Sequence, residues 1–345
     1  MRLNPQTIRK WRRFKEIKRG YYSFILFGLL VLFCMVAELI VESKAVVVKY
    51  EGQYFFPTYS DFIPGTTFGE DYKHETNYRK LAERFKTEDN GNWVLLPLVP
   101  YNAFENDLKD DIYPPYPPDQ FHYLGTDKIG RDVVARLVYG FRLAFFFSLL
   151  LLIFSYGIGI VVGCAMGYFG GRFDLVFQRM IEIWTNIPIL YVVIIIASIM
   201  VPTFWSLLAV MVFFNWTIMT WYMRTQTYKE KEREYVHAVK SLGASHSRII
   251  GKHIIPNTLS IIVTFAPFTM VSGITALTAL DFLGFGIPAP EPSWGELLSQ
   301  GTEHLDSYWI GGSVVASMVI VLTMVTFIGE AVREAFDPRK FTYFE

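Results

Sequence analysis

Three side chains in one short stretch could coordinate a metal ion. His122, Asp127 and Asp132 carry ligand atoms that zinc and similar ions accept. Their spacing does not match H-E-x-x-H, in which two histidines one helical turn apart face the same way. We therefore predict a surface position for His122 and helix capping for the two aspartates, with Gly125–Asp127 preceding a helix that begins near Lys128. A membrane-embedded enzyme is the alternative from another class of protein.

Nucleotide chemistry is not expected either. The chain has no G-x-x-x-x-G-K-[ST] segment, whose glycines and lysine hold phosphate groups at a fixed spacing. We predict no catalytic residue, metal or cofactor in this chain. The formal net charge is +0, so there is no general attraction to nucleic acid. Cys34 and Cys164 fall in apolar stretches, where we expect them to pack rather than to form a disulfide.

The distribution of charge predicts a membrane protein. Five long windows of the 345-residue chain contain no charged residue: Gly20–Ala37, Leu143–Gly171, Ile183–Met223, Asn257–Leu280 and Ser307–Gly329. A membrane helix needs about 20 apolar residues. The window 183–223 is long enough for two spans, with a turn at Val201–Thr203. The expected fold class is therefore an all-α polytopic membrane protein with six transmembrane helices.

Two features of the spans bear on transport. No span carries a buried pair of charges that would mark a proton or sodium relay, which disfavours an ATP-independent secondary transporter. Asp281 and Glu330 lie at span ends, where we expect them to be solvated. In one span, glycines recur every four residues and predict a face that a neighbouring backbone approaches closely. These are Gly159, Gly163, Gly167 and Gly171.

Charge also predicts the orientation and the domains. Residues 1–20 are strongly basic, which by the positive-inside rule places this segment in the bacterial cytoplasm. Transmembrane helix 1 is expected at 21–41 and five more helices within 141–330, so the tail 331–345 returns to the cytoplasm. Residues 42–140 then form an extracytoplasmic insertion of mixed structure. In it, Ala45–Tyr50 and Trp93–Leu98 alternate as strands do.

The segment from Glu232 to Pro256 predicts a helix, a turn and a second helix between the fourth and fifth spans. One side of the first helix gathers Tyr235, Ala238, Val239 and Leu242, and the other Glu234, His237, Lys240 and Ser241. Gly243 permits the turn, and Ser245–His253 is expected to be the second helix. Helices this short need a surface to pack on. The lipid interface, the protein's own loops and a groove on a soluble subunit all fit.

This segment resembles the EAA loop of binding-protein-dependent ABC importer permeases. The matching residues are Glu234, Ala238, Gly243, His253 and Pro256. Val239 stands where a second alanine is usual, and His253–Pro256 departs from I-x-L-P, but the spacing from Gly243 to Pro256 is kept. The resemblance implies a coupling loop, 225–256, whose short helix docks into the cleft of a separate ATPase subunit. The coupling residues would be Glu234, Tyr235, Ala238, Val239, Leu242, Gly243, His253 and Pro256.

Four further stretches are similar to dipeptide and oligopeptide permeases, in that family's order. They are Leu124–Arg142, Gly167–Trp184 (their first cytoplasmic loop), Asp281–Leu298 and Gly329–Lys340. The large insertion and the segment "LDFLGFG", 280–286, look most like the Yej-type permeases, implicated in uptake of peptides and of the antibiotic microcin C. The resemblance thus implies the six-helix fold of a type I ABC importer permease.

The same resemblance implies the function and the partners. The chain would be the membrane-spanning subunit of an ATP-driven peptide importer, coupling ATPase closure to alternating access. A second permease subunit, ATPase subunits that bind ATP and Mg²⁺, an extracytoplasmic peptide-binding protein and membrane lipid are the expected partners. Nickel chelates and glycosides remain alternative cargoes, and no residue of the substrate path is predicted.

Overall fold

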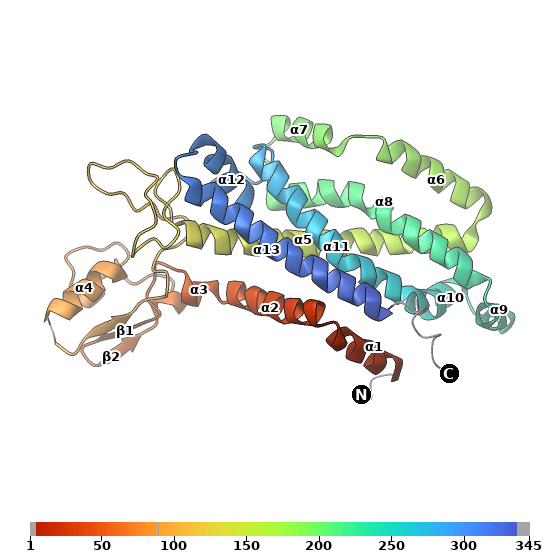
Figure 1. The fold of residues 1–345 in the computed structure, drawn as a ribbon, viewed down its shortest axis with the longest axis horizontal. Coiled ribbons are helices and arrows are strands. Elements are labelled where there is room, and N and C mark those ends of the chain that lie inside the picture. Colours follow the sequence, from red (N-terminus) through yellow and green to blue (C-terminus); the bar gives the residue numbers. More distant parts are fainter. Residues whose placement is uncertain (1–4, 89, 337–345) are drawn as a thin grey trace.

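The chain forms an elongated bundle of helices with a small mixed unit at one end (Figure 1). The computed structural model describes residues 5–88 and 90–336. Parts of the expected basic segment (1–4) and of the expected tail (337–345) lie outside these residues. The first helices are α1 (Pro5–Glu16), α2 (Lys18–Met35), α3 (Ala37–Ile40) and α4 (Tyr78–Glu88). The others are α5 (Val133–Phe169), α6 (Gly171–Thr185), α7 (Ile189–Ile199), α8 (Phe204–Lys231), α9 (Glu234–Ser241), α10 (His246–Ile249), α11 (Ile255–Phe282), α12 (Trp294–Glu303) and α13 (Tyr308–Phe336).

Five helical segments are long and apolar enough to cross a membrane. They are Lys18–Met35, Val133–Phe169, Phe204–Lys231, His246–Phe282 and Tyr308–Phe336. The helices α6 and α7 together make a sixth if a bent pair counts as one span. When α6 and α7 are counted as one broken third span, the prediction of a helical protein with six spans is confirmed.

The broken span differs from the expected one. Residues 167–184 resembled a cytoplasmic loop, but Gly171–Thr185 is helical and meets α7 at an angle of 66°. Pro188, which caps α7, separates the two helices. Its ring fixes its own backbone and keeps the preceding residue out of helical geometry. The predicted break at 201–203 is present, because α7 ends at Ile199 and α8 begins at Phe204.

The glycine face of α5 packs against α8, and three of its four predicted members are correct. A Cβ at Gly159 would lie 2.6 Å from the carbonyl oxygen of Trp216, and one at Gly163 would lie 2.5 Å from that of Thr220. Gly167 meets Arg224 in the same way. Gly171 is not part of this face, because α5 ends at Phe169 and the chain turns there into α6.

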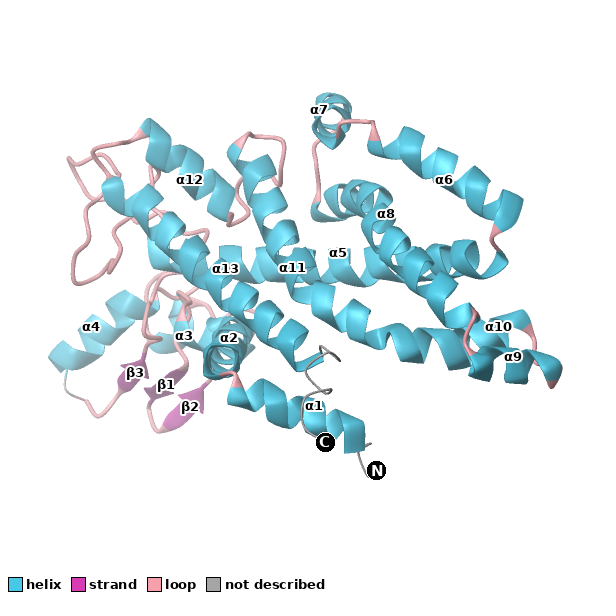
Figure 2. Ribbon diagram, turned by 45° about the vertical axis from the view of Figure 1, so that its right-hand side comes forward, coloured by secondary structure: helices cyan, strands magenta, loops and turns pink. Residues whose placement is uncertain are grey.

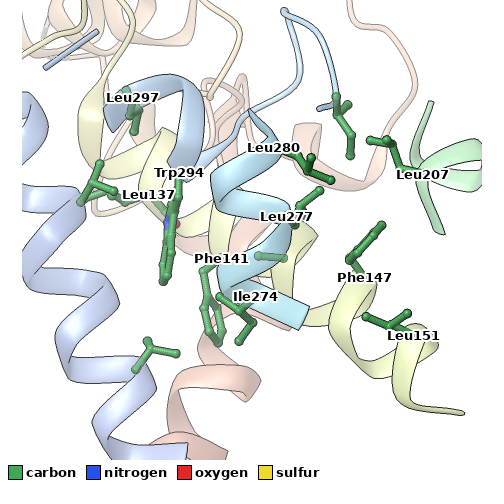
Figure 3. Close-up of a cluster of buried hydrophobic side chains, with 14 of the residues drawn as sticks. Leu137, Phe141, Phe147, Leu151, Leu207, Ile274, Leu277, Leu280, Trp294 and Leu297 are labelled. Atoms are coloured by element: carbon green, nitrogen blue, oxygen red, sulfur yellow. The ribbon is translucent and has the colours of Figure 1, made fainter. Parts of the chain in front are cut away.

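Apolar side chains from α5, α8, α11, α12 and α13 form most of the main core, part of which is drawn in Figure 3. Phe141 and Phe147 of α5 point from one helix toward opposite sides of this cluster, and Leu277 and Leu280 of α11 lie between α5 and α8. Trp294 of α12 packs on Phe141 and donates an indole hydrogen bond of 2.9 Å to the carbonyl oxygen of Leu137. The core thus ties the short helix α12 to the long helix α5.

The insertion has its own small core. Its strands β1 (Val47–Tyr50), β2 (Gln53–Phe55) and β3 (Trp93–Leu95) pair antiparallel in the order β2-β1-β3. The strands β1 and β3 lie inside the runs predicted as strands, whereas β2 was not predicted. Val48 pairs with Phe55 and Val94, and this face packs against the helix α4 (Figure 2). Two 3-10 turns, η1 (Pro57–Tyr59) and η2 (Gly65–Phe68), connect β2 to the segment before α4.

Candidate functional site

The helix α9 is held on the bundle by a side chain that the sequence pattern did not select. Val236 is only 2% exposed and packs against Ile249 and Ile254, with Tyr235 and Val239 beside it. We expected Tyr235, Ala238, Val239 and Leu242 to share one face. The structure divides them, since Tyr235 and Val239 turn toward the chain's own helices whereas Ala238 and Leu242 face outward.

The outward face of α9 is the unusual feature. Glu234, Ala238 and Leu242 recur every four residues and all three are exposed. Leu242 is 86% exposed, although it follows directly on a helix that has an apolar inner face available. A leucine side chain left in water gives up the stabilising free energy of burial, which is about 1.5–3 kcal/mol. This row of three is therefore suited to a partner surface.

Gly243 ends α9 as the sequence predicts. Its φ is +78°, in the left-handed region that a glycine adopts at little cost. The amide of Gly243 donates to the carbonyl of Lys240 at 3.0 Å, and that of Ala244 to Val239 at 3.3 Å. These two bonds form a Schellman cap. The cap fixes the direction in which the chain leaves α9 and returns to the bundle.

The segment after this turn is continuous with a membrane span. We expected Ser245–His253 to be a separate short helix, but α10, a single π-helical turn η3 (Ile250–Ile254) and α11 run on as one segment, 246–282. The π turn stands just before Pro256, which has no backbone N–H to donate. The carbonyl of His253 accepts a 2.7 Å bond from the amide side chain of Asn257.

Tyr235 links α9 to both neighbouring spans. Its hydroxyl donates to Glu230 at the end of α8 (2.7 Å) and lies 3.4 Å from the carbonyl oxygen of His253. Burial, together with the nearby Glu230 carboxylate, raises the pKa of Tyr235. The side chain therefore stays protonated as a donor. These contacts connect α9 to the end of α8 and to the turn η3 that precedes α11.

A polar hollow of about 300 Å³ lies between α9 and the end of α5. It is lined by Tyr168, Phe169, Lys231, Glu232, Val236, His237, Lys240 and His246. Tyr168 and His246 form a 2.9 Å hydrogen bond across its edge. The sequence pattern gave no signal for this contact, because Tyr168 stands at the end of another span.

At the opposite end of the bundle, several ionisable residues differ from their predictions. His122 is not a surface residue, since it is 0% exposed. Its Nδ1 lies 2.8 Å from Asp132 and its Nε2 lies 3.2 Å from Asp107, and its ring packs on Tyr101. Burial lowers the pKa of His122, but the two carboxylates outweigh that effect and raise it. The histidine therefore joins the insertion to the first turn of α5.

The capping prediction is right for one of the two aspartates. Asp132 caps α5 by accepting from the amide of Ala135 at 2.8 Å. The helix begins at Val133, not near Lys128, and Asp127 instead pairs with the buried Arg131 at 2.6 Å. Arg131 also reaches Glu296 of α12 at 2.8 Å.

The same end of the bundle holds a second buried arginine. Arg136 pairs with Glu296 and donates to the backbone carbonyls of Ala103 (2.9 Å) and Glu291 (3.0 Å). A buried charge is tolerated when a counter-charge and hydrogen bonds compensate for its loss of water. This charge network attaches both the insertion and α12 to the start of α5.

Asp281 also differs from its prediction. It is buried, not solvated, and accepts from the Ser293 hydroxyl at 2.5 Å and from the amide of Ile287 at 2.8 Å. It thus fixes the loop that leads from α11 to α12. Glu330 is partly exposed and pairs with Arg19 at 3.2 Å.

A bundle of apolar spans with a short amphipathic helix fixed at one end is the architecture of a membrane permease. The chain belongs to the family described as "binding-protein-dependent transport system inner membrane component", whose model matches residues 159–342. It is therefore a transport subunit and not an enzyme. ATP hydrolysis in such ABC importers is carried out by a separate subunit, and the predicted importer class is confirmed.

Individual relatives agree with this family. The chain is 38% identical to the inner membrane ABC transporter permease protein YejE of Escherichia coli, over 98% of this chain and 99% of the relative. It is 37% identical to the peptidoglycan transport system permease protein YejE of Agrobacterium fabrum, over 98% and 94%. The dipeptide permease DppC of Bacillus subtilis is 35% identical over 65% of this chain and 70% of its own length. A solved inward-facing MetNI methionine transporter superposes with a TM-score of 0.46 at 16% identity, over 59% of this chain and 97% of the other.

Proposed function

We propose that this chain is a permease subunit of an ATP-driven peptide importer and that α9 is the element on which its ATPase acts. The cargo assignment draws support from relatives named for transport of peptidoglycan and dipeptides. The importer would carry short peptides and peptide conjugates of the microcin C kind. The residues that line the path are not assigned.

The observation that carries the docking proposal is the division of α9 into two faces. Val236 fixes the helix to Ile249 and Ile254, while Leu242 and Ala238 are offered outward. A helix serving only as a connector would bury its leucine. A helix that fills a groove on a soluble partner presents apolar anchors about one turn apart, as α9 does. Among the coupling residues proposed from the sequence, Glu234, Ala238 and Leu242 contact the ATPase, and Tyr235, Val239, Gly243, His253 and Pro256 hold the helix in place.

Force would reach the spans through contacts already described. When two ATPase subunits close on ATP and Mg²⁺, their grooves draw the two docked helices together. Tyr235 and the Gly243 turn pass that displacement to α8 and to the continuous segment 246–282. The spans then shift between inward-open and outward-open states because the ATPase binds one state better than the other.

The proposed sidedness has α9 in the cytoplasm. The basic helix α1 lies at the same end of the bundle as α9 and α10, and the insertion lies at the opposite end (Figure 1). Positive charge gathers on the cytoplasmic side of membrane proteins. The N-terminus and the C-terminal tail are then cytoplasmic, and the insertion faces the peptide-binding protein outside. The assembly is completed by a second permease subunit.

Isolation of the chain from its native membrane tests the proposal. A tagged chain in mild detergent should retain an ATPase and a second permease, and its ATP hydrolysis in liposomes should rise when binding protein and peptide are added. If a nickel chelate or a glycoside stimulates ATP hydrolysis and peptide does not, the peptide assignment is wrong and that ligand is the cargo. A chain that carries no ATPase, even after cross-linking, would overturn the function.

The role of the insertion can be tested separately. The amide of Val46 donates to the carbonyl of Leu95 at 2.9 Å, so the two ends of the sheet-and-α4 unit are adjacent. Replacement of residues 47–94 by a short Gly-Ser linker keeps Tyr101, Asp107 and His122 in the chain, but it removes Arg79, whose guanidinium packs on the Tyr101 ring. If the insertion docks the binding protein, this variant loses peptide uptake but keeps its ATPase partner. Unchanged uptake would remove the docking role.

A further inference from the structure

An apolar groove lies beside α1, at the same end of the bundle as α9. Its volume is about 260 Å³. Trp11 and Phe14 of α1 and Phe24 of α2 line it, and Val263 of α11 and Ile328 and Val332 of α13 complete it. The groove therefore runs between the first helices of the chain and two later membrane spans.

The apolar lining is matched to the membrane. Phe24 and Trp11 are almost half exposed, at 46% and 47%. The adjoining surface of α2 is apolar as well, with Tyr22, Leu26 and Leu29 all exposed. Because the chain is an inner membrane component, acyl chains of lipid surround these side chains. A groove that opens into lipid is filled by the lipid's own chains and not by water.

The helix beside the groove is rich in positive charge. The helix α1 carries five Lys or Arg residues against Glu16 alone. Lys10 belongs to the groove itself, with its ammonium nitrogen 4.4 Å from the centre of the Phe336 ring. Within residues 5–88 and 90–336, Lys10 has no acidic partner. An ammonium group above an apolar groove matches a phosphate headgroup above acyl chains, and basic amphipathic helices bind anionic membrane surfaces for this reason.

We propose that this groove is a binding site for one anionic phospholipid. Its acyl chains lie against Phe24, Val263 and Val332, and its phosphate lies at Lys10 with the other cations of α1 around it. The bound lipid fills the space between α1 and the spans α11 and α13. Since α11 continues directly from the segment that holds α9, the lipid would sit against a span that moves during transport.

Native mass spectrometry of the full chain in detergent, titrated with phosphatidylglycerol or phosphatidylcholine, tests the site. The wild-type chain should retain one phosphatidylglycerol in preference to phosphatidylcholine. Lys10→Gln should weaken that binding about five-fold, the effect of one cation near an anionic headgroup. Val332→Trp should abolish it by filling the groove. Lys86→Gln, an equal charge change on the exposed side of α4, is the matched control and should bind as wild type.

Two results would overturn the proposal. One is equal retention of both lipids by the wild-type chain. The other is phosphatidylglycerol binding by Lys10→Gln that matches Lys86→Gln. Because Lys10 is an accessible side chain on a surface helix, Lys10→Gln keeps the test decisive even if Val332→Trp does not fold.

Discussion

The guanidinium of Arg224 in α8 donates two hydrogen bonds to the carboxylate of Asp174 in α6, from Nε to Oδ1 at 2.5 Å and from Nη2 to Oδ2 at 2.6 Å. Tyr228 and Gln178 donate to the same carboxylate at 2.7 and 2.8 Å. Asp174 belongs to the stretch that resembles a cytoplasmic loop, and it is the fixed point that holds the broken third span against α8.

Removal of this carboxylate charge should loosen α6. Asp174→Asn leaves the partly exposed Arg224 guanidinium without its anion, and the loss of such charge-assisted hydrogen bonds costs about 1.5–3 kcal/mol. The unfolding midpoint of the purified chain in detergent should fall. Glu182→Gln is the control, because the Arg179–Glu182 pair lies on the same helix but is exposed and is worth at most about 1 kcal/mol. Equal midpoints for the two variants would contradict the fixed-point role.

Close packing of α5 on α8 predicts a position-dependent effect of alanine. A methyl group at Gly163 meets the carbonyl of Thr220, so Gly163→Ala should destabilise the chain by about 1–3 kcal/mol through overpacking. Gly157→Ala lies on the same helix with nothing within 4 Å and should be neutral or slightly stabilising. Thermal unfolding of the two variants side by side measures the difference. A Gly163→Ala variant as stable as Gly157→Ala would show that the helices separate freely.

The two faces of α9 should respond differently to truncation. Leu242→Ala removes an exposed side chain, so stability should be unchanged while peptide-stimulated ATP hydrolysis is lost. Val236→Ala removes a buried one and should cost about 2 kcal/mol of stability. ATPase assays in liposomes and unfolding midpoints separate the two effects. Full stimulation in Leu242→Ala would exclude this leucine from docking.

The His122 cluster predicts a pH dependence of stability. The folded pKa of His122 is raised by Asp132 and Asp107, so the protonated histidine stabilises the fold. Its contribution is complete below the ordinary pKa of about 6.5 and is lost as the pH rises through the higher folded value. The unfolding midpoint should therefore fall on raising the pH from 6 to 9, and His122→Gln should flatten this response. His237→Gln, at an exposed position on α9, should leave it unchanged.

The sequence predicted the spans well because apolar length is a local property. The windows without charge located α2, α5, α8, α11 and α13. The α6 segment was missed because Arg172, Asp174 and Arg179 excluded it from every such window. The contacts of Asp174 with Arg224 and Tyr228, which lie about fifty residues later in the chain, compensate its charge beside α8.

The sequence predicted where the short helix α9 lies in the chain, but it did not predict which face of that helix packs on the bundle. Spacing alone does not show which side of α9 faces the bundle. Tyr235 and Val239 lie on one side, Ala238 and Leu242 lie on another, and both pairs are apolar. Val236 settles the question through Ile249 and Ile254, which lie beyond the Gly243 turn. His122 was mispredicted for the same reason, because its partner Asp107 comes from another loop. Tertiary contacts, not local pattern, determine which face of each element is free.

Cysteine cross-linking from α9 to the co-purified ATPase tests the central claim most directly. The two native cysteines, Cys34 and Cys164, are buried, so Leu242→Cys supplies the accessible thiol on the outward face. With a short bifunctional reagent in native membranes, Leu242→Cys should join the chain to the ATPase, whereas Lys86→Cys on α4 should not. Adducts at Leu242→Cys that shift with ATP would fit the proposed force transfer. An ATPase that never cross-links to Leu242→Cys, in membranes where peptide uptake proceeds normally, would contradict it.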